Sequence, residues 1–164
     1  MIEAKLADLR DVELIRKLGV AAFTETYVSI LERAQIDYML HWMYSAESLK
    51  RQMAEKHVYR IAYFDGEPCG YVSVQPEGES AYHLQKIYVL KKFQGRKIGE
   101  FLFKLALDCI KKEHPAPCRV SLNVNRNNGA VGFYKKMGMK KIAEGDFPIG
   151  NGWFMNDYIM AIDI

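Results

Sequence analysis

One segment in the middle of the 164-residue chain constrains the fold more than any other. Residues His83 to Leu90, in which Leu84, Ile87 and Val89 are apolar, predict a β-strand. A short loop with two glycines leads from this strand directly into Lys97 to Lys112. That stretch has the period of an amphipathic helix, with apolar residues at Ile98, Phe101, Leu102, Leu105, Ala106 and Cys109. The segment therefore favours an α/β protein in which a helix packs on a sheet.

The rest of the chain contains further strands and helices, and no repeat or linker divides it. Ser45 is expected to cap a helix that reaches about Glu55. Asp65-Gly66 is expected to form a hairpin turn, because this pair readily adopts positive φ. The order predicts one α/β domain over residues 1–164 with a single mixed sheet. The other expected elements are strands at Ile2 to Ala4, His57 to Phe64, Cys69 to Val74, Arg119 to Val124, Met139 to Ala143 and Trp153 to Ile162, and helices at Ala7 to Tyr27, Gln35 to Trp42 and Asn128 to Met137.

Composition excludes several classes of protein. Hydrophobic residues make up 49% and charged residues 26% of the chain, which excludes intrinsic disorder and a coiled coil. The formal net charge of +3 is too small for a nucleic-acid-binding surface, so no nucleic acid is expected as a partner. The N-terminus has no uninterrupted apolar run. We therefore expect neither a signal peptide nor a membrane-spanning segment. A membrane is not expected as a partner either.

Cysteine and histidine spacing gives no sign of a metal or disulfide site. The three cysteines, Cys69, Cys109 and Cys118, are odd in number and contain no CxxC pair, which argues against a disulfide framework and a zinc site. The histidines show no HxxxH or HxH spacing, so no metal is expected. This use of cysteine predicts a cytoplasmic protein.

The loop between the central strand and its helix has the properties of an anion site. The first amides of a helix have no partner within the helix, and they carry about half a unit of positive charge. Gly95 and Gly99 allow the backbone to approach an anion, and Lys91, Lys92, Arg96 and Lys97 add positive charge. The glycine pair alone is equally compatible with a simple turn on a solvated basic face. The loop lacks the GxxxxGK[ST] pattern of a P-loop.

Two segments resemble motifs of the GNAT superfamily of N-acetyltransferases. IYVLKKFQGRKIGEFLF resembles motif A, a strand followed by [QR]xxGx[GA] and a helix. NNGAVGFYKKMGM, which starts at Asn127, is similar to the NxxAxxFYxxxGF segment of that family. Further similarities, including DLRD from Asp8 and AAFTETY from Ala21, are closest to bacterial polyamine acetyltransferases typified by PaiA. The resemblance implies a mixed, mostly antiparallel sheet that is splayed in the middle and flanked by helices.

The resemblance also implies a binding site for acetyl-CoA as cosubstrate. The pantetheine would pair with the backbone of Ile87, Tyr88 and Val89, and the pyrophosphate would lie on the loop formed by Gln94, Gly95, Arg96, Lys97, Ile98 and Gly99. Lys97 stands where the motif has its middle glycine, and it is expected to keep an ordinary negative φ with its ammonium facing a phosphate. Asn127 would tie the following helix to the cofactor, or it would act only as a helix cap.

The same resemblance suggests how the acetyl group is transferred. Tyr134 falls on the position of the family's general acid, which protonates the departing thiolate; a plain core tyrosine is the alternative. An amine with a pKa near 10 is largely protonated at pH 7, so a base helps. His83 is the candidate base because its ordinary pKa is about 6.5, although a structural histidine is the alternative. Gln85 lies two residues further along, on the same face of the strand.

The acceptor is expected to be the primary amine of a small molecule. Phe23, Tyr27 and Gln85 are candidates for binding it, with Trp42 a weaker one. A polyamine acceptor would need carboxylates near the mouth of the cleft, and the chain offers Glu25, Glu32, Asp37 and Asp157. A regulatory domain that binds acyl-CoA without turnover remains the alternative function. A homodimer is left open.

Overall fold

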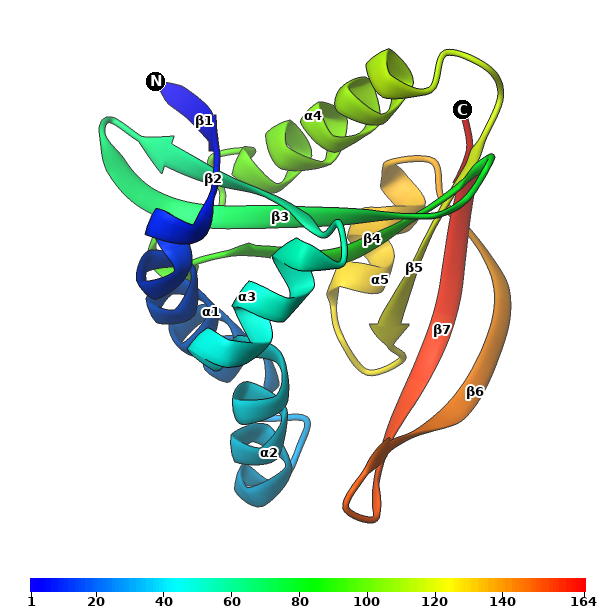
Figure 1. Ribbon diagram of the computed structural model, residues 1–164. Helices are drawn as coiled ribbons and strands as arrows, with labels where there is room; N and C mark the ends of the chain where they lie inside the picture. Colours follow the sequence, from blue (N-terminus) through cyan, green and yellow to red (C-terminus); the bar gives the residue numbers. More distant parts are fainter.

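The strands form one sheet in the order β1-β2-β3-β4-β5-β7-β6. The computed structural model describes all residues from 1 to 164 (Figure 1). Neighbouring strands are antiparallel except β4 and β5, which are parallel. The expected mixed, mostly antiparallel sheet is therefore confirmed. The strands are β1 (Ile2–Leu6), β2 (Val58–Phe64), β3 (Glu67–Gly78), β4 (Ala81–Val89), β5 (Arg119–Asn125), β6 (Lys140–Gly150) and β7 (Trp153–Asp163).

Helices cover both faces of the sheet, and each face has its own hydrophobic core (Figure 1). One core lies under α4 and α5 and contains Leu102, Phe103 and Leu122. The other core lies under α1, α2 and α3 and contains Phe23, Ile36 and Tyr71. The helices are η1 (Leu9–Asp11), α1 (Val12–Tyr27), α2 (Arg33–Tyr44), α3 (Ala46–Ala54), η2 (Lys91–Phe93), α4 (Ile98–Glu113) and α5 (Ala130–Lys136).

Local sequence signals explain several element boundaries. Ser45 precedes α3, and its hydroxyl accepts a hydrogen bond from the Ser48 amide, as expected of a cap. Asp65 and Gly66 both have positive φ in the β2–β3 turn. All three cysteines are free thiols. None of the helices is long and apolar enough to cross a membrane.

Several strands are longer than the sequence predicted, β3 and β6 by the most. β3 continues beyond Val74 to Gly78, and β6 continues beyond Ala143 to Gly150. β6 is an edge strand, so its many polar residues face solvent and Pro148 does not have to donate to a second neighbour. A period-2 apolar pattern marks half-buried strands and misses exposed extensions of this kind.

β4 and β5 are paired only at one end. Residues 81–83 of β4 pair with residues 119–121 of β5, and beyond these pairs the two strands diverge. The remainder of each strand therefore has an inner edge without a strand partner. The expected splay of the sheet is present, and it opens a gap in the middle of the sheet.

A β-bulge in β4 lies next to the point of divergence. Ser73 of β3 pairs with Lys86, whereas the next residue, Val74, pairs with Leu84, so Gln85 has no partner on β3. The bulge changes which face the following side chains occupy. Leu84 belongs to the core under α4, while Lys86 points to the side of α2 and α3.

Candidate active site

A cleft of about 650 Å³ opens where β4 and β5 diverge. One wall is β4 from Leu84 to Val89, and the other is β5 from Leu122 to Val124. The start of α4 closes one end, and α5 together with the end of α1 contributes the remaining lining. The cleft thus joins the two segments that resemble the family motifs.

The loop that opens α4 presents a row of free amides at this cleft. None of the backbone N–H groups from Gly95 to Glu100 donates a hydrogen bond within the protein. Gly95 has a φ of 84°, which a residue with a side chain rarely adopts. Backbone amides that converge in such a loop form an anion-binding concavity. The loop therefore fits the pyrophosphate of a coenzyme A derivative.

Lys97 contradicts the expectation of an ordinary negative φ. Its φ is 62° and its ψ is 22°, so it lies in the left-handed region just before α4 begins at Ile98. A residue with a Cβ is disfavoured in this region by roughly 1–2 kcal/mol. The glycine that the family motif places here would avoid this cost. Lys97 nevertheless lines the cleft, as the anion-site prediction requires.

The basic residues near the loop do not all serve the cleft. Lys91 and Lys97 line it, and Lys136 of α5 joins them from the opposite side. The Arg96 guanidinium instead lies 4.7 Å from the ring centroid of Phe64 and outside the lining. Lys92 forms an exposed ion pair with Glu67 at 2.9 Å. Positive potential at the cleft therefore comes mainly from lysines.

Tyr134 lies on α5, where it is buried and lines the cleft. The ring packs against Phe133 at 5.3 Å and Phe103 at 6.4 Å between centroids. Its hydroxyl makes no hydrogen bond within the protein, although the residue is only 7% exposed. Burial, with a smaller contribution from Tyr27, raises the pKa of Tyr134 well above its ordinary value. The phenol is therefore protonated at neutral pH and free to donate to a ligand.

Gly129, and not Asn127, stands at the N-cap of α5, and the side chain of Asn128 makes the polar contact at the start of this helix. The Asn128 side-chain oxygen accepts a hydrogen bond from the Ala130 amide at 2.9 Å, next to the start of α5. Its amide nitrogen lies 3.4 Å from the Tyr27 hydroxyl, and the residue lines the cleft. Asn127 does not line it. Only geometry distinguishes two adjacent asparagines, so the motif alone did not identify Asn128.

The end of α1 borders the cleft through Tyr27. Its hydroxyl meets Asn128, and its ring packs on Phe23 at 4.5 Å between centroids. Phe23 itself is 1% exposed and does not line the cleft, so its part is to pack against the ring of Tyr27. Trp42 lies on α2 outside the cleft and stacks on Tyr38. Of the aromatic candidates for acceptor binding, the structure brings only Tyr27 to the site.

His83 is the last residue of the three-residue pairing of β4 and β5, opposite Ser121, and does not line the cleft. Its Nδ1 is 3.2 Å from the Ser121 hydroxyl and 3.4 Å from a carboxylate oxygen of Glu77. Burial lowers the pKa of His83, while Glu77 opposes the shift. Gln85 does line the cleft, and its amide donates to Gln75, the residue that pairs with His83. The two side chains therefore share a face.

The four candidate carboxylates have different surroundings. Glu25 lines the cleft and accepts a hydrogen bond from the Lys91 amide. Asp37 forms an exposed ion pair with Arg33, and Glu32 is an exposed residue before α2. Asp157 of β7 is 6% exposed; one of its oxygens lies 3.4 Å from the Asn123 amide, and the other has no partner. Burial raises the pKa of Asp157.

The cleft thus gathers most of the site residues expected from the sequence. The expected residues that lie outside its lining are Phe23, Trp42, His83, Lys92, Arg96 and Asn127, together with the carboxylates Glu32, Asp37 and Asp157. Three residues that no sequence signal marked also line it, namely Lys86, Asn128 and Lys136. No three or more His, Cys, Asp or Glu side chains are grouped to hold a metal ion. The lining residues expected from the sequence are Glu25, Tyr27, Gln85, Ile87, Tyr88, Val89, Lys91, Gln94, Gly95, Lys97, Ile98, Gly99 and Tyr134.

Comparison with known proteins identifies the family. The family described as Acetyltransferase (GNAT) domain matches residues 24–154. A spermidine N(1)-acetyltransferase of Thermoplasma acidophilum is 23% identical over 144 residues, which are 85% of this chain and 88% of that protein. The chain therefore belongs to the GNAT acetyltransferases: it is an N-acetyltransferase, and acetyl-CoA is its cosubstrate.

Solved structures share the fold over the whole chain. The PaiA N-acetyltransferase of Thermoplasma acidophilum, solved in complex with coenzyme A, superposes with a TM-score of 0.82 at 23% identity, covering 100% of this chain and 99% of that one. The ribosomal-protein-S18-alanine N-acetyltransferase of Escherichia coli gives a TM-score of 0.75 at 16% identity, covering 100% and 94%. The splayed sheet is thus the fold of this family.

Proposed function

We propose that the protein transfers the acetyl group of acetyl-CoA directly to the primary amine of a small aliphatic molecule of the polyamine type, with Tyr134 as general acid. The observation that supports this proposal is that one cleft contains both an anion-binding loop and a free hydroxyl group. Free amides from Gly95 to Glu100 lie at one end, and the unpartnered hydroxyl of Tyr134 borders the same cleft. A thioester held by its pyrophosphate at the first end reaches the second through the gap in the sheet.

The cosubstrate is held by backbone more than by side chains. The pyrophosphate would accept hydrogen bonds from the loop amides, with Lys97 adding charge. The pantetheine arm would lie along the inner edge of β4 from Ile87 to Val89, which has no strand partner. Gln94 already donates to the Val89 carbonyl, so the arm would use the remaining polar groups of this edge.

The acetyl transfer needs no covalent intermediate with the enzyme. The neutral amine attacks the thioester carbonyl, and the C–S bond breaks as the amide forms. The departing thiolate takes a proton from the Tyr134 hydroxyl, and the amine loses a proton to His83 through water or to solvent. Tyr134 then regains its proton from solvent. Because its pKa is raised, Tyr134 returns to the protonated form before the next turnover.

The proposed acceptor class rests on charge and on the relatives. A polyamine has a second ammonium some distance from the reacting amine, and a partly buried carboxylate is a suitable partner for it. Glu25 lines the cleft, whereas Asp157 lies outside its lining and has one carboxylate oxygen without a partner. The similarity to a spermidine N(1)-acetyltransferase supports the same class.

Steady-state kinetics on an amine panel test the proposal. Thiol release is followed with spermidine, spermine, an aminoglycoside and a peptide with a free N-terminus, each at low and moderate salt. We expect turnover of the polyamines, with kcat/KM falling as salt screens the charges. Turnover of the peptide alone would contradict the acceptor class. Binding of acetyl-CoA without turnover of any amine would support the sensor function instead.

A further inference from the structure

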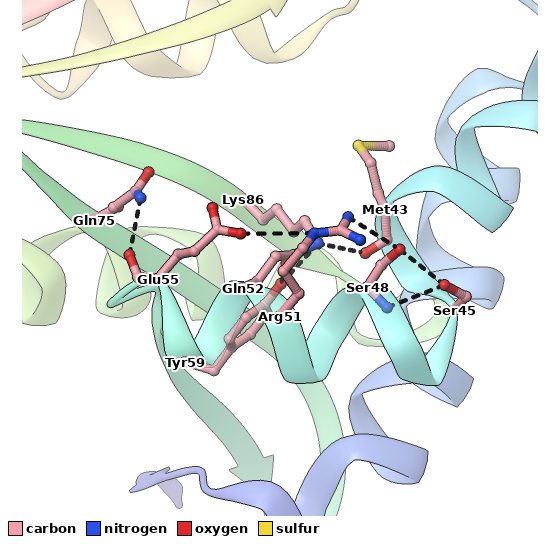
Figure 2. A network of polar contacts seen from close by, with 9 residues as sticks. All are labelled: Met43, Ser45, Ser48, Arg51, Gln52, Glu55, Tyr59, Gln75 and Lys86. Atoms are coloured by element: carbon pink, nitrogen blue, oxygen red, sulfur yellow. Dashed lines mark hydrogen bonds and ion pairs between the residues drawn. The ribbon is translucent and has the colours of Figure 1, made fainter.

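Lys86 is a buried lysine with no carboxylate partner. It lies on β4 next to the bulge, is 6% exposed and has no charged partner. Figure 2 shows its side chain reaching from β4 towards α3 and the end of α2. Its Nζ is 3.0 Å from the Met43 carbonyl oxygen, 3.0 Å from Gln52 Oε1 and 2.7 Å from the Tyr59 hydroxyl. One ammonium thus joins α2, α3, β2 and β4.

The surroundings match the charged form of the lysine. An ammonium has three donors and no acceptor, and three oxygen acceptors surround this one. Nζ also lies 4.1 Å from the ring centroid of Tyr44, whose face attracts a cation. The Met43 carbonyl is one of the last in α2, where the helix carries partial negative charge. These contacts offset the cost of burying the charge.

The position of Lys86 links this network to the cleft. Gln85 has no partner on β3, so the ladder alone does not fix this part of β4. Lys86 itself lines the cleft, and the next residues, Ile87 to Val89, form the edge that faces the cosubstrate. A displacement of the bulge would therefore move the wall along which the pantetheine lies.

We propose that Lys86 is a positioning residue for acetyl transfer: its ammonium clamps the β4 bulge to α2, α3 and β2 and so sets the wall of the cosubstrate cleft. The inference rests on the proposed placement of acetyl-CoA in this cleft, and it does not depend on the acceptor. Nζ is held by Met43, Gln52 and Tyr59 in this network (Figure 2), so the proposed role is positioning and not contact with the reacting atoms.

The clamp depends on pH. Burial lowers the pKa of Lys86 to about 7. Tyr44 of α2 and Tyr59 of β2 contact it directly, and His57, just before β2, lies within range of its charge. The other charged or titratable groups nearby on the packed elements are Arg51 and Glu55 of α3, which pair with each other, and His83 of β4. A neutral amine keeps only two of its three N–H donors, so the clamp loosens as pH rises through this range. Folding stability changes in the opposite direction. Between pH 7 and about 10.4 the lysine of the unfolded chain binds more protons than the lysine of the folded protein, so the free energy of unfolding increases as pH rises through this range.

Isothermal titration with coenzyme A, in the absence of any amine, tests the clamp between pH 6 and pH 9. In the wild type we expect the dissociation constant to rise about tenfold over this range while the melting temperature does not fall. Lys86→Met keeps a similar shape without the charge, so it should bind about tenfold more weakly at pH 6 and lose this part of the pH dependence. The matched control is Lys50→Met, which removes an exposed lysine of α3 and should follow the wild type.

A second variant keeps the test decisive if Lys86→Met folds poorly. Tyr59→Phe removes one acceptor of the ammonium and keeps the ring, so the weakening of binding should begin at lower pH. The proposal is overturned if Lys86→Met binds coenzyme A as the wild type does, or if its affinity is reduced by the same factor at every pH. No binding of coenzyme A by the wild type would overturn the cleft assignment together with the clamp.

Discussion

The ring of Tyr44 lies directly against the backbone of Gly19, so that α1 and α2 meet without an intervening side chain. A Cβ at Gly19 would come within 2.2 Å of a ring carbon of Tyr44. Tyr44 is 1% exposed, and its hydroxyl is hydrogen-bonded to that of Tyr71. The ring therefore cannot move aside without disturbing the Tyr71 contact or the face that it presents to Lys86.

Gly19→Ala should therefore destabilise the protein by overpacking, by about 1–3 kcal/mol. Chemical denaturation measures the free energy of unfolding. Gly78→Ala is the control, because nothing lies within 4 Å of a Cβ at that position. Equal stabilities of the two variants would show that α1 and α2 adjust freely at this contact.

Lys97 combines an unfavourable backbone conformation with a useful charge, and two substitutions separate the effects. Lys97→Ala keeps the Cβ at a φ of 62° and removes the ammonium, so coenzyme A should bind more weakly. Lys97→Gly removes both the ammonium and the backbone cost, so it should be more stable than Lys97→Ala by roughly 1–2 kcal/mol and bind coenzyme A with a similar affinity, because the cost is the same in the free and the bound protein. Chemical denaturation measures the first difference and calorimetry the second. Different affinities of the two variants would mean that the loop changes conformation when the ligand binds.

Tyr134→Phe tests the general acid. The variant keeps the ring that packs on Phe103 and Phe133, so its melting temperature and its affinity for coenzyme A should remain near wild type. Turnover should fall about a hundredfold or more, which is the usual scale for a general acid. Phe133→Leu, a packing change in the adjacent residue, is the comparison. Full activity of Tyr134→Phe would reduce Tyr134 to a core residue.

His83 gives a pH prediction with a definite direction. A base must be neutral to accept the amine proton, so kcat/KM should fall as pH decreases through the pKa of His83. Burial lowers that pKa, so the acid limb should lie below the ordinary value of about 6.5. His83→Ala should abolish the limb, and His41→Ala, at an exposed position of α2, should leave it in place. A limb unchanged in His83→Ala would assign the proton to another group.

Asp157 should show opposite effects on stability and on acceptor binding. Its pKa is raised by burial, so the folded state favours the protonated form and loses stability as pH rises through that pKa. At pH 7, Asp157→Asn removes a buried charge and should raise the melting temperature. The same change should raise KM for spermidine if the carboxylate binds an ammonium. A melting temperature that falls, with KM unchanged, would make Asp157 a purely structural residue.

The sequence predicted the elements that bear a strong period or a family motif. The helix after Gly95 and its glycine loop were identifiable because the apolar spacing and the turn residues occur together. The face that Lys86 occupies was not predictable, because one bulge at Gln85 reverses the alternation and nothing in the apolar pattern marks it. The φ of Lys97 and the role of Asn128 depend on how the backbone turns at single residues. These details arise from tertiary packing, which overrides local preference.

The short pairing between β4 and β5 also bears on how the molecule deforms. Three residue pairs join the two halves of the sheet, while the core beneath α4 includes side chains from both halves, among them Val72 and Val120. Hydrogen bonds of a ladder fix the distance between strands, whereas apolar packing has no preferred direction. Strand hydrogen bonds thus hold the two halves together at one end only. The width of the gap between them is therefore set by side-chain packing and by no strand pairing.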